Sequence, residues 1–144
     1  MMRKLLLILI AATSPLAAQD APVGFEAART TPLTTGQWNY ATTANGSEAR
    51  FGNTFVIRCD RNARRVTVRR IEISATAPAT PMIVTTDLAT NMLPADGILA
   101  NTNRALDAIA FSRGRFIVSG GGGGVRLVLP ASPEAARSIE DCRN

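Results

Sequence analysis

The side chains that most enzymes use for proton transfer and nucleophilic attack are scarce in this sequence. It contains no histidine, and Lys4 is its only lysine. This composition excludes a Ser–His–Asp triad, a Cys–His pair and a histidine-ligated zinc site. The chemistry that remains is that of carboxylates, hydroxyls and arginines, and we expect neither a metal nor a cofactor.

Glu140 and Asp141 are the only acidic residues that are adjacent in the sequence. Neighbouring residues on a helix point about 100° apart, so these two carboxylates cannot face each other as the acid and base of a hydrolase do. Acidic groups at the end of a helix are also disfavoured by its dipole. We therefore expect a structural role, in which Arg113 or Arg115 forms an ion pair with Glu140 or Asp141.

Arginines are concentrated in one part of the chain. Six of them follow one another along a predicted strand, turn and strand, and they are Arg58, Arg61, Arg64, Arg65, Arg69 and Arg70. Their guanidinium groups can bind an acidic protein, an anionic polymer or a lipid headgroup in the cell envelope. The alternative is that they are solvated charges that protect an edge strand from aggregation.

A run of five glycines, Gly120–Gly124, is the other unusual local feature. Loops that cradle phosphate carry a Lys and a Ser or Thr after their glycines, and this run lacks them. We therefore interpret it as a flexible hairpin tip, because glycine permits every turn conformation and orders none.

The two cysteines predict a single disulfide. Cys59 lies in a predicted central strand and Cys142 near the C-terminus, so only one intramolecular pairing is possible. No Cys-x-x-Cys motif and no histidine is present to activate a thiol, which favours a structural bond in an oxidising compartment.

Residues 1–18 have the parts of a secretory signal peptide. Arg3 and Lys4 precede the apolar run Leu5–Ala12, and a Pro and small residues follow it. Removing this segment takes away two of the 16 basic residues and none of the 11 acidic ones, which lowers the net charge from +5 to +3. We expect a periplasmic or secreted protein with no transmembrane segment in the mature chain and no role in nucleic-acid binding.

Alternating apolar residues predict about seven short strands after an extended leader over residues 19–36. They begin at Trp38 and include 53–59, 65–73, 82–86, 97–100, 115–119 and 125–129. In the predicted strand 65–73, the even-numbered Val66 and Val68 would point to one face and the odd-numbered Ile71 and Ile73 to the other. Either both faces of that strand are partly covered, or a β-bulge lies near Arg69 and Arg70, and we favour the bulge.

Two short helices complete the pattern, one near 104–111 with Thr102 or Asn103 as its cap and one near 133–141. Ser132 and Pro133 are typical of a helix start. The mature chain is expected to be a single domain over residues 37–144, mainly β, with the architecture of a small antiparallel sandwich or barrel.

Several segments are similar to a group of small, uncharacterised exported proteins of Gram-negative bacteria. They are residues 106–116, which read LDAIAFSRGRF, and the C-terminal pattern of Leu129, Pro130, Glu134, Arg137 and 139–143, together with Trp38, Tyr40 and 58–60. The resemblance implies a periplasmic or secreted location and no particular activity. The expected fold also resembles that of the invasion-associated locus B proteins, whose cysteine pattern is not evident here, so their role is not transferred.

From these features we expect a non-enzymatic periplasmic binding or interaction module. Two alternatives stay open, a small hydrolase or lyase that uses only carboxylates, hydroxyls and arginines, and a secreted enzyme inhibitor. The first requires two carboxylates that converge in a cleft. For the second, this sequence lacks the Ser-Gly-x-x-Tyr loop found in known lysozyme inhibitors.

Overall fold

The structure is a computed structural model that describes residues 24–72 and 76–144. The predicted signal peptide, residues 19–23 of the predicted leader, and Ile73 lie outside the described residues. The described chain is mainly β, with nine strands in two antiparallel sheets, as in a small β-sandwich.

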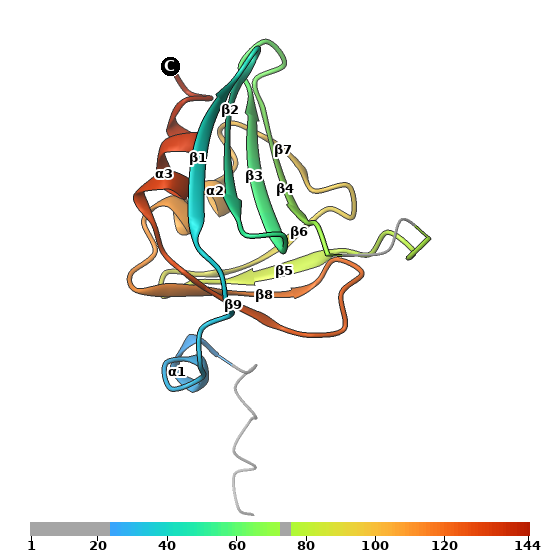
Figure 1. Ribbon diagram of the computed structural model, residues 1–144, viewed down its shortest axis with the longest axis vertical. Helices are drawn as coiled ribbons and strands as arrows, with labels where there is room; N and C mark the ends of the chain where they lie inside the picture. Colours follow the sequence, from blue (N-terminus) through green and yellow to red (C-terminus); the bar gives the residue numbers. More distant parts are fainter. Residues whose placement is uncertain (1–23, 73–75) are drawn as a thin grey trace, which may run out of the picture.

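The first sheet has five strands in the order β1-β2-β3-β4-β7. They are β1 (Trp38–Thr43), β2 (Gly46–Phe51), β3 (Phe55–Asp60), β4 (Arg65–Arg70) and β7 (Ile98–Ala100). The second sheet has four strands in the order β6-β5-β8-β9. They are β5 (Met82–Thr85), β6 (Thr90–Leu93), β8 (Arg115–Gly120) and β9 (Leu127–Pro130). Its strands run across the lower end of the five-stranded sheet in Figure 1.

Three short helices accompany the sheets: α1 (Phe25–Ala28), α2 (Arg104–Ala110) and α3 (Pro133–Glu140). The side chain of Asn103 accepts from the Ala105 N–H at the start of α2, and Ser132 accepts from the Ala135 N–H at the start of α3. Both predicted helices are confirmed. α3 packs against β1, β2 and β3, and Figure 1 shows it beside β1.

One continuous core lies between the sheets and the two longer helices. Phe51 and Phe55 from the first sheet and Phe116 from the second are fully buried, and Trp38 packs against all three rings. The Trp38 indole N–H donates to the Pro130 carbonyl at 2.8 Å. The aromatic cluster therefore joins the two sheets and satisfies its one polar group.

The predicted disulfide is present and joins Cys59 of β3 to Cys142, 83 residues later. Both cysteines are buried. Beside them, the Ser138 hydroxyl on α3 donates to the Ile57 carbonyl at 3.2 Å and lies against Ser47. Small side chains on both elements let α3 approach the sheet closely, and the disulfide then fixes the end of the helix.

The predicted bulge near Arg69 and Arg70 is wrong. β4 pairs with β3 in one unbroken register, from Asp60 opposite Arg65 to Phe55 opposite Arg70. The other possibility, that both faces of β4 are partly covered, accounts for the two parities: Val66 and Val68 lie in the core, and Ile71 lines a groove on the opposite face.

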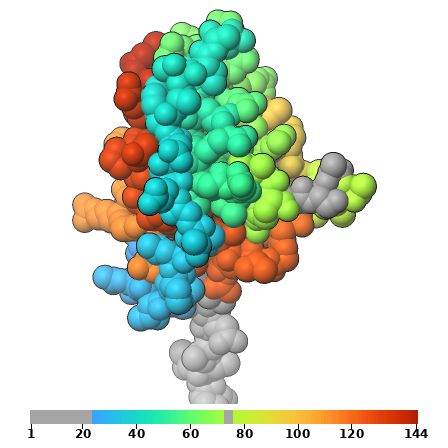
Figure 2. Space-filling view, viewed as in Figure 1, coloured from blue at the N-terminus to red at the C-terminus, as the bar shows by residue number. Residues whose placement is uncertain are grey.

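Residues 24–36 of the predicted leader are packed onto the domain. Ala28 is fully buried, and the Arg115 guanidinium donates to the carbonyls of Ala28 and Thr31. Thr34 and Val128 exchange two hydrogen bonds of 2.9 Å. This segment covers the outer side of β8 and β9, and Figure 2 shows it in blue against the lower part of the molecule.

The glycine run is also held in place rather than loose. Gly120, Gly121 and Gly122 have positive φ values of 72°, 67° and 83°. The Gly122 N–H donates to Thr80 at 2.7 Å, and a Cβ at Gly123 would overlap the Arg70 guanidinium. The predicted hairpin is confirmed, because β8 and β9 pair antiparallel, and its loop is packed against the buried Arg70.

An arginine-lined candidate binding groove

The five-stranded sheet has a solvent-facing side that carries most of the clustered arginines. Side chains alternate along a strand, so the residues between the core positions of β2, β3 and β4 point away from the core. We call this side the outer face; its central residues are Glu48, Arg50, Val56, Arg58, Thr67, Arg69 and Ile98.

A shallow groove of about 250 Å³ lies on the outer face. Its lining residues are Arg50, Val56, Arg58, Thr67, Arg69, Ile71, Asp96 and Ile98. The floor is apolar, while three guanidinium groups and one carboxylate form its rim. Val56 is only 5% exposed although it points away from the core, because neighbouring side chains cover it.

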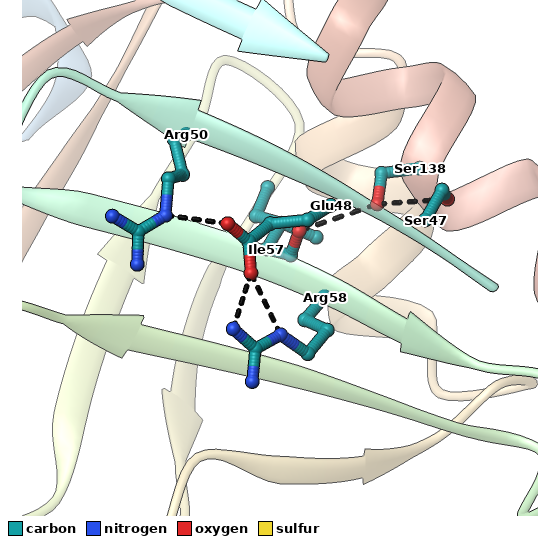
Figure 3. Close-up of polar contacts among 6 residues, drawn as sticks. All are labelled: Ser47, Glu48, Arg50, Ile57, Arg58 and Ser138. Carbon is teal, nitrogen blue, oxygen red and sulfur yellow. Dashed lines mark hydrogen bonds and ion pairs between the residues drawn. The ribbon is translucent and has the colours of Figure 1, made fainter. Parts of the chain in front are cut away.

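Glu48 is held between two of these arginines (Figure 3). Arg50 donates to one carboxylate oxygen, and the Arg58 Nε donates to the other at 2.7 Å. Burial alone would raise the pKa of Glu48, but the hydrogen bonds and positive charges of Arg58 and Arg50 outweigh it and lower the pKa. Glu48 therefore neutralises much of the charge on that side of the groove.

Three arginines of β4 and its preceding turn have no such partner. No carboxylate of the described residues lies within ion-pair distance of Arg64, Arg65 or Arg69, and all three are exposed. Arg65 and Arg69 both point to the outer face, and Arg64 is in the turn at its end. The arginines without a direct ion pair thus lie along β4, with Asp60 opposite Arg65 as the nearest strand carboxylate.

Arg64 also has an unusual backbone. Its φ is 52°, and it is the one non-glycine residue of the described chain with a positive φ. An L-residue in this region costs roughly 1 kcal/mol, which glycine would avoid. This backbone closes the turn between β3 and β4, where the Arg64 N–H donates to the Arg61 carbonyl at 3.3 Å and the Arg64 carbonyl accepts from the Asn101 N–H at 3.1 Å.

Two of the six predicted anion-binding arginines have structural roles instead. Arg70 points into the molecule, where its side chain is 2% exposed, pairs with Glu72 and donates to the Gly120 carbonyl at 3.3 Å. Arg61 donates to the Asp141 main-chain carbonyl at 3.1 Å. The sequence-based prediction also missed Arg50, because β2 was not predicted. The alternation of Glu48 and Arg50 between Ser47 and Phe51 was the available signal.

The interpretation of these arginines as guards of an edge strand does not hold for Arg58 and Arg65. β3 lies between β2 and β4, and β4 pairs with β7 through Arg65, Val66 and Thr67. β7 covers only the first half of β4, so Arg58 and Arg65 do not protect an open edge, whereas Arg69 has no partner in β7.

The predicted ion pair between Arg113 or Arg115 and the C-terminal acids is also wrong. Arg115 is bound to carbonyls of the segment 24–36, and the Arg113 main-chain N–H donates to Asp87. Both arginines are thereby held at the start of β8, away from α3. Glu140 instead pairs with Arg143 at 3.2 Å.

Asp141 is bound by residues from three parts of the chain. The Tyr40 hydroxyl donates to its carboxylate, and Arg61 lies 3.9 Å away. Burial would raise the pKa of Asp141, but the hydrogen bonds of Tyr40 and Ser47 and the charges of Arg61 and Arg137 outweigh it and lower the pKa. This network attaches the end of α3 to β1 and to the β3–β4 turn.

Two carboxylates of the packed helices α2 and α3, Asp107 and Glu140, share one arginine. Asp107 and Glu140 approach each other, but both bind Nη1 of Arg143, at 2.7 and 3.2 Å. No group of three or more potential metal ligands occurs among the described residues. In the same residues, no helix is long and apolar enough to cross a membrane.

Comparisons with known proteins do not identify the chain. It matches no family model, and no curated protein and no solved structure is significantly similar to it.

Proposed function

We propose that this chain is an exported, non-enzymatic binding module of the cell envelope, and that the outer face of its five-stranded sheet binds anionic ligands. The observation that carries the proposal is the row of exposed arginines along β4 and its preceding turn, Arg64, Arg65 and Arg69, none of which forms an ion pair with a carboxylate of the described residues. Guanidinium groups bind carboxylate and phosphate with good geometry, so such a row attracts anions.

Two features support an oxidising, extracytoplasmic location. The cysteines form a bond that is buried in the core, and the N-terminal sequence has the pattern of a secretory signal. A binding role is preferred over hydrolysis because the two carboxylates that approach each other, Asp107 and Glu140, are joined by Arg143.

The proposal is tested by retention of the purified mature chain on immobilised dextran sulfate. The Arg65→Gln/Arg69→Gln variant should elute at markedly lower salt than the wild type. The matched control is Arg113→Gln/Arg126→Gln, which has the same net charge and alters two exposed arginines near the other sheet. Equal elution of the two variants would show that net charge alone governs retention, and it would overturn the proposal.

A further inference from the structure

We infer that the groove on the outer face binds a single-chain anionic amphiphile, an alkyl or acyl chain that ends in a phosphate or carboxylate. This inference rests on the proposed function and specifies its ligand class. The chain would lie over Val56, Ile71 and Ile98, and the acidic group would meet Arg69.

The apolar floor of the groove favours a ligand that has a hydrocarbon part. The solvent-facing side of an antiparallel sheet is normally polar. Here three aliphatic side chains from β3, β4's end and β7 line one groove, and Ile98 remains 40% exposed. A purely ionic ligand, such as a sulfated polymer, would leave this apolar surface in water. An alkyl chain would cover it and gain the free energy of burial.

The charge of the groove's rim favours a ligand with a single acidic group. Glu48 engages Arg50 and Arg58, so their charges are already partly compensated. Asp96 accepts from the Ile98 main-chain N–H at 2.9 Å and is not within ion-pair distance of Arg69. The groove therefore offers one uncompensated cation beside its apolar floor, which suits a ligand with one acidic headgroup.

The volume of the groove favours a ligand with one short chain. Sites for drug-sized molecules enclose roughly 300–1,000 Å³. At about 250 Å³ and open on one side, this groove matches a single short chain better than a folded partner or two acyl chains.

A series of alkyl phosphates tests the inference, with methyl, butyl, hexyl and octyl phosphate as monomers in solution. Binding is followed by calorimetry. Affinity should rise about twofold to fourfold for each methylene added, the range for partial to full burial of a CH₂ group. An affinity that does not change with chain length would overturn the inference.

Two matched variants distinguish binding in the groove from nonspecific hydrophobic binding elsewhere on the surface. Ile98→Asn should remove the dependence on chain length and leave binding of methyl phosphate unchanged. Ile83→Asn is the matched control, because Ile83 is an isoleucine of the other sheet with nearly the same exposure, 39%. If Ile83→Asn has the larger effect, the groove is not the site.

The same reagents distinguish failure of the inference from failure of the proposed function. Retention on dextran sulfate that depends on Arg65 and Arg69, combined with no chain-length effect, would refute the amphiphile and leave anion binding intact. Loss of both would refute both. Sedimentation with phosphatidylglycerol vesicles that depends on Arg69 and Ile98 would show binding of a two-chain membrane lipid, and it would overturn the assignment of a single-chain ligand. Binding to octyl phosphate alone would identify a free amphiphile.

Discussion

Arg64 and Glu48 are expected to have opposite effects on the stability of the protein and on the proposed anion binding. Arg64 has a positive φ and no ion pair among the described residues, so it costs stability and leaves its charge available. Glu48 is bound by two arginines, so it stabilises the sheet and masks charge. Substitutions at these residues should therefore move stability and affinity in opposite directions.

Replacing Arg64 with glycine should stabilise the protein and weaken its binding. Arg64→Gly relieves the left-handed backbone conformation, and the free energy of unfolding should rise by about 0.5–1 kcal/mol in urea denaturation. Retention on dextran sulfate should fall. Arg64→Gln is the control: it keeps the strained backbone, so binding should fall with no gain in stability. A stable Arg64→Gly variant with undiminished retention would remove Arg64 from the binding surface.

Replacing Glu48 should have the reverse effect. Glu48→Gln removes the negative charge that accepts three hydrogen bonds from Arg50 and Arg58, and it should lower stability at neutral pH by about 1 kcal/mol. Anion binding should become tighter, because the charges of Arg50 and Arg58 are no longer compensated. Unchanged or weaker retention of the variant on dextran sulfate would show that Arg50 and Arg58 do not contribute to anion binding at the outer face.

The pH dependence follows from the lowered pKa of Glu48. The stability that its ion pairs provide is fully present above the ordinary carboxyl value of 4.5 and is lost as the pH falls through the lowered value. Glu48→Gln should therefore flatten the dependence of stability on pH below about 4.5. The dependence should not vanish, because Asp141 also has a lowered pKa and titrates in a similar range.

At the scale of elements, the helices could be predicted because short sequence motifs mark where they begin. Ser132 followed by Pro133 specifies the start of α3, and Asn103 that of α2. β2 and β6 were not predicted. β2 buries Ser47 and Ala49 where a strand usually has larger apolar residues, because α3 lies close above them, and β6 exposes Met92 at its edge. Both depend on tertiary packing that a single segment does not encode.

The disulfide should contribute strongly to the attachment of α3. Closing a loop of 83 residues is worth about 4 kcal/mol in the chain-entropy model. A Cys59→Ala/Cys142→Ala variant should lose stability of that order in urea denaturation. The wild-type protein should show no free thiol under non-reducing conditions. A loss below about 1 kcal/mol would mean that packing of Ile139 and the Asp141 network alone fix the helix.

At the scale of the whole molecule, the sequence predicted the β-rich class and the covalent link but not the arrangement of the arginines. Strand order and register decide which residues of a face become neighbours, and they bring Arg50, Arg58 and Arg69 to one groove. Alternation along β4 turns Arg70 into the molecule. The contact of Arg115 with the segment 24–36 joins residues more than eighty positions apart. Such pairings are set by how the two sheets meet, which short motifs do not specify.

The proposed binding depends on the outer face of the five-stranded sheet, and chemical-shift mapping examines that surface directly. Octyl phosphate is titrated into the ¹⁵N-labelled mature chain, and amide and arginine side-chain resonances are followed. We expect the largest shifts at Val56, Arg58, Thr67, Arg69 and Ile98, with few changes in β8, β9 or α3. Shifts that are spread evenly over the molecule, or that centre on the four-stranded sheet, would contradict binding at the outer face.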